Sequence, residues 1–142
     1  LWSSDEVAAF DPVTATWHVL PKLPEPRSSH DAVVHGDRLF VVGGWTLAGE
    51  QQTWLTTGWV LDLATPGAVW QALPTPPFQR SALAVAGLGE RLFALGGLDQ
   101  DGEPSPQVDV LDLGTGTWQR GPDLPGFGFA VAAVTVGESL FA

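Results

Sequence analysis

The side chains best suited to ligand chemistry stand just before two apolar runs: Arg27, His30 and Asp31 before the first, and Arg80, 53 residues after Arg27, before the second. A guanidinium group can hold a carboxylate or an acidic peptide through paired hydrogen bonds. The arginines and the histidine could instead form hydrogen bonds between neighbouring parts of the chain. Asp31 is the least expected of the four, because the corresponding later positions hold alanine. We therefore treat all four as candidate binding residues.

The segment 45–59, which follows a pair of glycines, is a second candidate. It holds Trp45, Trp54 and Trp59 among polar residues. Tryptophans presented on a loop are typical of peptide-binding hot spots and of sugar stacking. Trp59 begins an apolar run, and we expect it to cover the edge of a sheet. For Trp45 and Trp54, ligand binding and packing both remain open.

The segment 99–103, Asp-Gln-Asp-Gly-Glu, has the alternating oxygen ligands and the glycine of a calcium loop. It lacks the later ligands of an EF-hand, so we predict a solvated acidic loop. The three histidines show no metal-type spacing. The sequence has no nucleophile elbow, phosphate loop or dinucleotide fingerprint. We predict no metal, no cofactor and no catalytic residue, although enzymatic activity stays open.

Composition narrows the classes of partner. Six basic and sixteen acidic residues give a net charge of −10, and the sequence has no basic run, which argues against nucleic acid. No apolar run approaches the roughly 20 residues that a membrane-spanning helix needs. The chain contains no Cys, which excludes disulfides and thiolate ligands within it. None of these features indicates a compartment.

A repeated pattern positions the candidate residues. Gly43-Gly44 and Gly96-Gly97 each close an apolar strand, and Gly43 and Gly96 are 53 residues apart. Before each pair, and again near the C-terminus, a Gly-acid dipeptide separates two apolar runs, which is typical of a tight β-hairpin. The runs before these dipeptides are rich in small residues, which favours an innermost strand. Helical periodicity is absent and 17 Gly and 12 Pro punctuate the short runs, so the sequence predicts an all-β fold.

The second half of each repeat is a further predicted hairpin. An apolar run ends in an Asp, and a Trp and then a Pro follow; the Asp residues are Asp11, Asp62 and Asp112, and the Trp residues are Trp17, Trp70 and Trp118. An Asp at such a turn can accept backbone N–H bonds through its side chain. We predict that each Trp is a packing anchor between neighbouring sheets.

Together these features resemble the Kelch repeat family. The resemblance rests on the two glycine pairs and on the spaced Trp17, Trp70 and Trp118. It departs from the family pattern where Phe10, Leu61 and Leu111 replace a usual Tyr and where Gly128 stands at the position of Arg27 and Arg80. The resemblance implies Kelch-type β-propeller blades of four antiparallel strands, with an incomplete ring in this chain.

The repeats divide residues 1–142 into four parts of a partial propeller. We expect 1–24 to be the outer hairpin of a split blade, 27–75 and 80–125 to be complete blades, and 128–142 to be the inner hairpin of a split blade. Two copies could form a six-bladed ring. We favour an internal piece of a longer propeller, because an isolated copy exposes unpaired strand edges. Either way, we expect further blades or a second copy to complete the ring.

The resemblance implies that partners bind the loop before the inner strand and the loop after the glycine pair. Our leading hypothesis is a binding or scaffold module for a protein or peptide partner that uses Trp45, Trp54, Arg27 and Arg80. A first alternative is a carbohydrate-binding or carbohydrate-active propeller, similar to the sialic acid epimerases, which uses Arg27, His30 and Asp31 and has the tryptophan rings as platforms for a sugar. A second alternative is a set of structural blades that support a site elsewhere in a longer chain.

Overall fold

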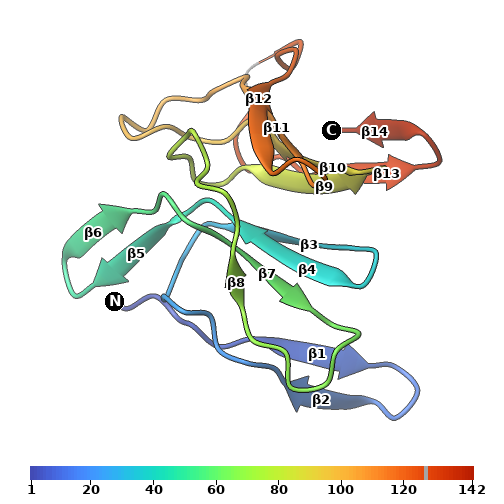
Figure 1. Cartoon of the computed structure of the whole chain (residues 1–142). Coiled ribbons are helices and arrows are strands. Elements are labelled where there is room, and N and C mark those ends of the chain that lie inside the picture. Colours follow the sequence, from blue (N-terminus) through green and yellow to red (C-terminus); the bar gives the residue numbers. More distant parts are fainter. Residues whose placement is uncertain (127) are drawn as a thin grey trace.

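The computed structural model describes residues 1–126 and 128–142 (Figure 1). Within these residues, all regular structure is β-strand, fourteen strands in total. The predicted all-β class is therefore confirmed. The described residues contain no helix that is long and apolar enough to cross a membrane.

Two four-stranded antiparallel sheets form the middle of the chain. The first has the order β3 (Asp31–His35), β4 (Arg38–Val42), β7 (Gly58–Asp62) and β8 (Gln71–Ala72). The second has the order β9 (Ala84–Leu88), β10 (Arg91–Leu95), β11 (Val108–Asp112) and β12 (Thr117–Arg120). Each sheet is a meander in which sequential strands pair, as in a propeller blade.

The two ends of the chain form two-stranded sheets. β1 (Ala8–Asp11) pairs with β2 (Thr16–Val19), and β13 (Val134–Val136) pairs with β14 (Ser139–Phe141). These hairpins fall in the segments 1–24 and 128–142, whose assignment to the outer and inner halves of a split blade stays a prediction. The sheets do not close into a ring within the chain (Figure 1).

The Gly-acid dipeptides form the predicted tight turns. His35 pairs with Arg38 across Gly36, and the same two-residue loop joins β9 to β10 and β13 to β14. Gly36 has a φ of 59°, in the left-handed region, which glycine adopts without the steric cost of a Cβ. The turn is therefore set by a local sequence signal.

The glycine pairs lie where one sheet contacts the next unit. Gly44 N–H donates to the Arg80 carbonyl at 2.8 Å, and Gly97 N–H donates to the Gly128 carbonyl at the same distance. A Cβ on Gly43 would lie 2.3 Å from Leu83 Cδ2. The glycines thus let the segment before the next inner strand approach the backbone closely.

Two of the three repeated tryptophans, Trp70 and Trp118, pack between neighbouring units as predicted. Trp70 Nε1 donates to the Pro21 carbonyl at 2.8 Å, and Trp118 Nε1 donates to the Pro74 carbonyl at 2.8 Å. Trp70 is only 9% exposed, whereas Trp17 on the N-terminal hairpin is 69% exposed. Trp70 and Trp118 therefore each link their unit to the preceding one, whereas Trp17 does not pack in this way in the described structure.

The aspartates at the outer turns also behave as predicted. The Asp11, Asp62 and Asp112 carboxylates accept the backbone N–H groups of Val13, Ala64 and Thr115 respectively, at 2.8 to 2.9 Å. The Asp62 carboxylate also accepts the Thr65 hydroxyl at 2.8 Å, which is the largest cause of its lowered pKa. The backbone hydrogen bonds favour the charged form as well, and the pKa values of Asp11 and Asp112 are lowered mainly by them.

One segment differs from its prediction. The sequence predicts a loop over 45–59, but the structure forms a hairpin from β5 (Trp45–Ala48) and β6 (Gln51–Trp54). Gly49, with a φ of 68°, makes the two-residue turn possible. Figure 1 shows this hairpin projecting from the end of the molecule opposite the β3–β4 turn. The expectation of an irregular loop was therefore wrong, and the two candidate tryptophans lie on strands.

Candidate binding site

The Arg27 side chain is buried beneath the β5–β6 hairpin. It is 3% exposed. Its Nη1 donates to the carbonyl oxygens of Gly43 at 3.1 Å and Thr57 at 3.3 Å, which precede and follow the hairpin. Its Nη2 donates to the Glu25 carboxylate at 2.9 Å and to the Thr57 hydroxyl at 2.8 Å. Burial lowers the pKa of Arg27, and the Glu25 charge opposes that shift.

Arg80 has the same geometry in the second complete sheet. It is 2% exposed, and its Nη1 donates to the carbonyl oxygens of Gly96 at 2.7 Å and Gln107 at 2.6 Å. Its Nη2 donates to the Asp109 carboxylate at 2.5 Å, and its guanidinium lies 4.4 Å from the centre of the Phe78 ring. Burial raises the pKa of Asp109, and the Arg80 charge opposes that shift.

The two arginines therefore share one structural role. Each clamps the two ends of the segment that leaves the sheet after the glycine pair. This geometry fits the hydrogen-bonding alternative for Arg27 and Arg80, because their Nη donors are directed to protein groups. The arginines can then affect a ligand through the segments that they hold in place.

Asp31 lies between neighbouring sheets. Its Oδ2 accepts the Val85 N–H of β9 at 2.7 Å, and its Oδ1 accepts the Ala32 N–H at 2.8 Å. His30 is half-buried, and its Nδ1 is buried without a hydrogen-bond partner among the described residues. Burial lowers the pKa of His30, as does the nearby Arg27, while Asp31 opposes the shift. Both residues thus stand at the junction of β3 with the second sheet.

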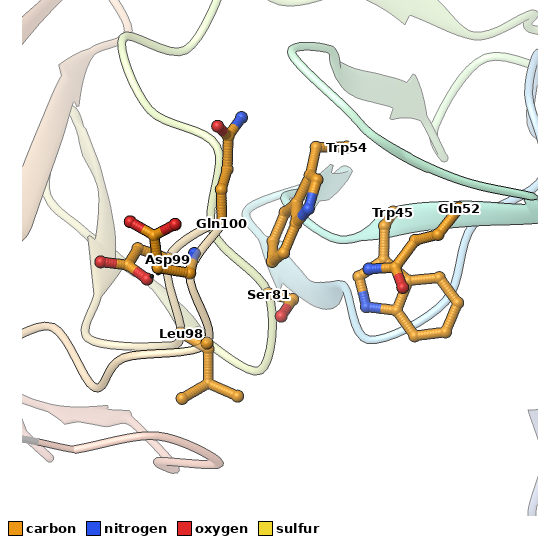
Figure 2. Close-up of a pocket in the computed structure, with 9 residues that line it drawn as sticks. Trp45, Gln52, Trp54, Ser81, Leu98, Asp99 and Gln100 are labelled. Atoms are coloured by element: carbon orange, nitrogen blue, oxygen red, sulfur yellow. Dashed lines mark hydrogen bonds between the residues drawn. The ribbon is translucent and has the colours of Figure 1, made fainter.

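Trp45 and Trp54 are brought together by the β5–β6 hairpin. They are directly opposed in its register, and both are half-buried. They line one wall of a groove of about 600 Å³ together with Gln52. The segment 99–102 lines the opposite wall, Leu98 lies on the same side as Asp99, and Ser81 lies between the two walls (Figure 2). The groove therefore spans two consecutive repeat units.

The tryptophan wall is anchored to the rest of the molecule by backbone hydrogen bonds. Trp45 exchanges N–H and carbonyl bonds with Ser28 at 3.1 and 2.8 Å. Leu47 accepts the Ser3 N–H at 2.9 Å, and the Leu47 N–H donates to the Ser3 hydroxyl at 2.8 Å. At the other end of the hairpin, buried Leu55 donates its N–H to the Gly44 carbonyl at 3.2 Å. These bonds fix the wall before any ligand arrives.

The acidic wall is fixed in a similar way. Asp99 Oδ1 accepts the N–H groups of Asp101 and Glu103, both at 2.9 Å, and the Asp99 backbone N–H donates to the Glu103 carbonyl at 3.0 Å. Gly102 has a φ of 81°, which permits the tight turn that brings Glu103 back to Asp99. Within residues 1–126 and 128–142, no group of three or more His, Cys, Asp or Glu side chains is arranged to hold a metal ion.

Sequence reasoning identified the two tryptophans of the groove as candidates but took the acidic segment for a solvated loop. The two segments lie about fifty residues apart in the sequence. The available signal was the repeat, because both segments directly follow a glycine pair. The groove residues that were not among the predicted site residues are Gln52, Ser81, Leu98 and the segment 99–102.

Comparison with protein families gives a match over most of the chain. The sequence model of the Kelch motif matches residues 26–77 and 79–125. Kelch-like protein 34 of Homo sapiens is 30% identical over 128 residues, which cover 86% of this chain and 20% of that protein. Kelch domain-containing protein 8B of Rattus norvegicus is 34% identical over 141 residues, which cover 94% of this chain and 39% of that protein.

A solved structure has the same fold. The structure of YjhT superposes with a TM-score of 0.70 at 19% identity, over 85% of this chain and 35% of that one. The chain thus spans about a third of YjhT and about a fifth of Kelch-like protein 34.

Proposed function

Because the chain belongs to the Kelch repeat family of β-propellers, we propose that it is a binding module whose groove holds a protein or peptide partner. Kelch repeat proteins generally mediate protein–protein interactions. The observation that carries the proposal for this chain is the pair of indole rings, Trp45 and Trp54, on a fixed wall of a groove between two blades.

The energetics of the groove are those of a peptide-binding hot spot. Each indole is half-buried and can lose further solvent contact to a ligand. Burying a large apolar side chain contributes about 1.5 to 3 kcal/mol, and hot spots are enriched in tryptophan. The backbone hydrogen bonds of both walls reduce the entropy that binding would otherwise cost.

All residues that line the groove lie between Trp45 and Gly102. Its walls come from the segments that follow Gly44 and Gly97, which connect strands of the two four-stranded sheets. The two-stranded sheets at the ends of the described chain contribute no residue that lines it. The proposal therefore depends on the two middle sheets of the chain.

The test is a selection of peptides on the full chain. A random peptide library displayed on phage is selected against the wild type, and the selected peptides are measured by isothermal titration calorimetry. The Trp45→Ala/Trp54→Ala variant should weaken their binding about tenfold or more. The matched control is Trp17→Ala, which removes an exposed indole outside the groove.

Two results would contradict the proposal. One is a set of selected peptides that bind the Trp45→Ala/Trp54→Ala variant as tightly as the wild type, although circular dichroism shows that the variant is folded. The other is a glycan array on which the wild type binds sugars through these tryptophans while no peptide is selected. The second result would support the carbohydrate-binding alternative instead.

A further inference from the structure

We propose that the groove selects a cationic side chain, a lysine or an arginine of the bound peptide. This side chain lies between the tryptophan wall, with Trp45 and Trp54, and the acidic wall, which is the segment 99–102. This inference rests on the proposed function, since it names the chemistry of the peptide that the groove takes. It depends on two different attractions that meet in one cavity of about 600 Å³.

The first attraction comes from the indole rings. The face of an indole carries partial negative charge and attracts ammonium and guanidinium groups, and tryptophan is the strongest of the aromatic residues in this respect. Figure 2 shows the Trp54 ring beside the groove, on the side that looks toward Asp99 and Gln100. A peptide side chain that enters the groove therefore meets an aromatic surface along one side.

The second attraction comes from the carboxylates of the opposite wall. Asp99 uses Oδ1 for its own loop, which leaves Oδ2 to accept a hydrogen bond from a ligand. Asp101 adds a second carboxylate three residues from Leu98 at the base of the groove. Charge-assisted hydrogen bonds of this kind are shorter and stronger than neutral ones.

No positive charge competes with the ligand in this cavity. The residues described around the groove include no lysine or arginine. Arg27 and Arg80 are buried, and each is paired with a carboxylate, Glu25 and Asp109 respectively. An acidic peptide would therefore meet only repulsion from the groove, whereas a basic one is attracted from a distance by the chain's net charge of −10.

The two walls of the groove can contact the stem and the charged head of one long side chain at the same time. The two tryptophans are opposed across one hairpin, so they form a single wall. The facing wall is a closed acidic turn held by the N–H groups of Asp101 and Glu103. The stem of a lysine or arginine can lie along the indole surface while its charged head reaches the carboxylates.

A positional-scanning peptide library tests the inference. Immobilised hexapeptide mixtures, each with one fixed residue at one position, are probed with the full chain in about 50 mM and about 500 mM sodium chloride. Mixtures that fix Lys or Arg should bind about tenfold better than those that fix Asp or Glu, and the preference should shrink at high salt because screening weakens exposed charge pairs.

Matched variants locate the preference in the groove. Asp99→Asn/Asp101→Asn removes two charges, keeps the Asp99 side-chain oxygen that accepts the loop N–H groups, and should lower the preference for Lys and Arg several-fold. The control Glu90→Gln/Glu138→Gln removes two exposed charges at the hairpin turns and should leave the preference unchanged.

The outcomes separate the two proposals. Suppose that peptide binding depends on Trp45 and Trp54, but that mixtures with a fixed neutral or acidic residue bind as tightly as mixtures with a fixed Lys or Arg. The inference of a cationic side chain is then overturned, and the proposed binding module stands. If no mixture shows binding that depends on these tryptophans, the proposed function fails as well. A preference for Lys and Arg that survives Asp99→Asn/Asp101→Asn also overturns the inference, because it would place the cation elsewhere.

Discussion

Replacing Gly43 by alanine would test how the glycine pair joins neighbouring sheets. Gly43 has a φ of 77°, and a Cβ there would lie 2.3 Å from Leu83 Cδ2 and 2.8 Å from the Arg80 carbonyl oxygen. Gly67 is a matched control, because its φ is 75° and an added Cβ would meet nothing within 4 Å. The two substitutions therefore share the backbone cost and differ in the contact between sheets.

The expected magnitudes follow from this geometry. An L-residue in the left-handed region costs about 1 to 2 kcal/mol, which applies to both variants. Forcing an extra methyl group into a packed contact costs about 1 to 3 kcal/mol more, which applies to Gly43→Ala alone. The Leu83 side chain can turn away, but the Arg80 carbonyl belongs to the backbone and already accepts the Gly44 N–H. We expect Gly43→Ala to lose about 2 to 5 kcal/mol in total.

Urea unfolding followed by tryptophan fluorescence measures the difference. With a slope of about 2 kcal/mol per molar urea, the Gly43→Ala midpoint should fall about 0.5 to 1.5 M below that of Gly67→Ala. Equal midpoints for the two variants would refute the reasoning, because they would mean that the close approach of the next unit at Gly43 does not constrain the side chain there.

Three further outcomes are expected. Arg80→Met should cost about 3 to 5 kcal/mol in urea unfolding, because it leaves the Asp109 carboxylate buried without its partner; a loss below about 1 kcal/mol would contradict this. The pKa of His30 is lowered from 6.5 by burial, so the stability that neutral His30 contributes should be lost as the pH falls below that value. His30→Gln should weaken the dependence of the urea midpoint on pH between about pH 7 and pH 5. A pH dependence equal to that of the wild type would exclude His30 as its cause. Trp70→Phe should lose about 1 kcal/mol more than Trp17→Phe, because only Trp70 donates an indole hydrogen bond to a neighbouring unit.

The regular part of the fold could be predicted from the sequence because its signals are local. The Gly-acid turns and the Asp residues at the outer turns each satisfy their hydrogen bonds within a few residues. The repeat then extends these local signals over the chain. The packing role of Trp70 could be predicted from its fixed place in the repeat, although its hydrogen-bond partner, Pro21, lies 49 residues away in the sequence.

The β5–β6 hairpin could not be predicted in the same way. Its second strand, Gln51–Trp54, is polar and mostly exposed, so it shows no alternation of apolar and polar residues. The hairpin is held by tertiary contacts instead, from Ser3 and Ser28 to the backbone of β5. Such contacts have no signature in the segment that they stabilise.

The candidate site was predicted only in part, because the acidic segment was taken for a solvated loop. The sequence showed that Arg27 and Arg80 are repeated, but burial and the carbonyl partners of a guanidinium depend on how the chain folds. Trp45 and Trp54 were identified by type alone. Their meeting with the segment 99–102 depends on the placement of one blade beside the next, which no local pattern encodes.

The junction between units has a consequence for how such proteins diversify. Gly44 and Gly97 donate to backbone carbonyls, and the acceptor is supplied by Arg80 in one case and by Gly128 in the other. The joint is therefore made through main-chain atoms in both cases, although the residue that supplies the acceptor differs. Substitutions in the exposed segments after the glycine pairs can change the surface without removing these two hydrogen bonds.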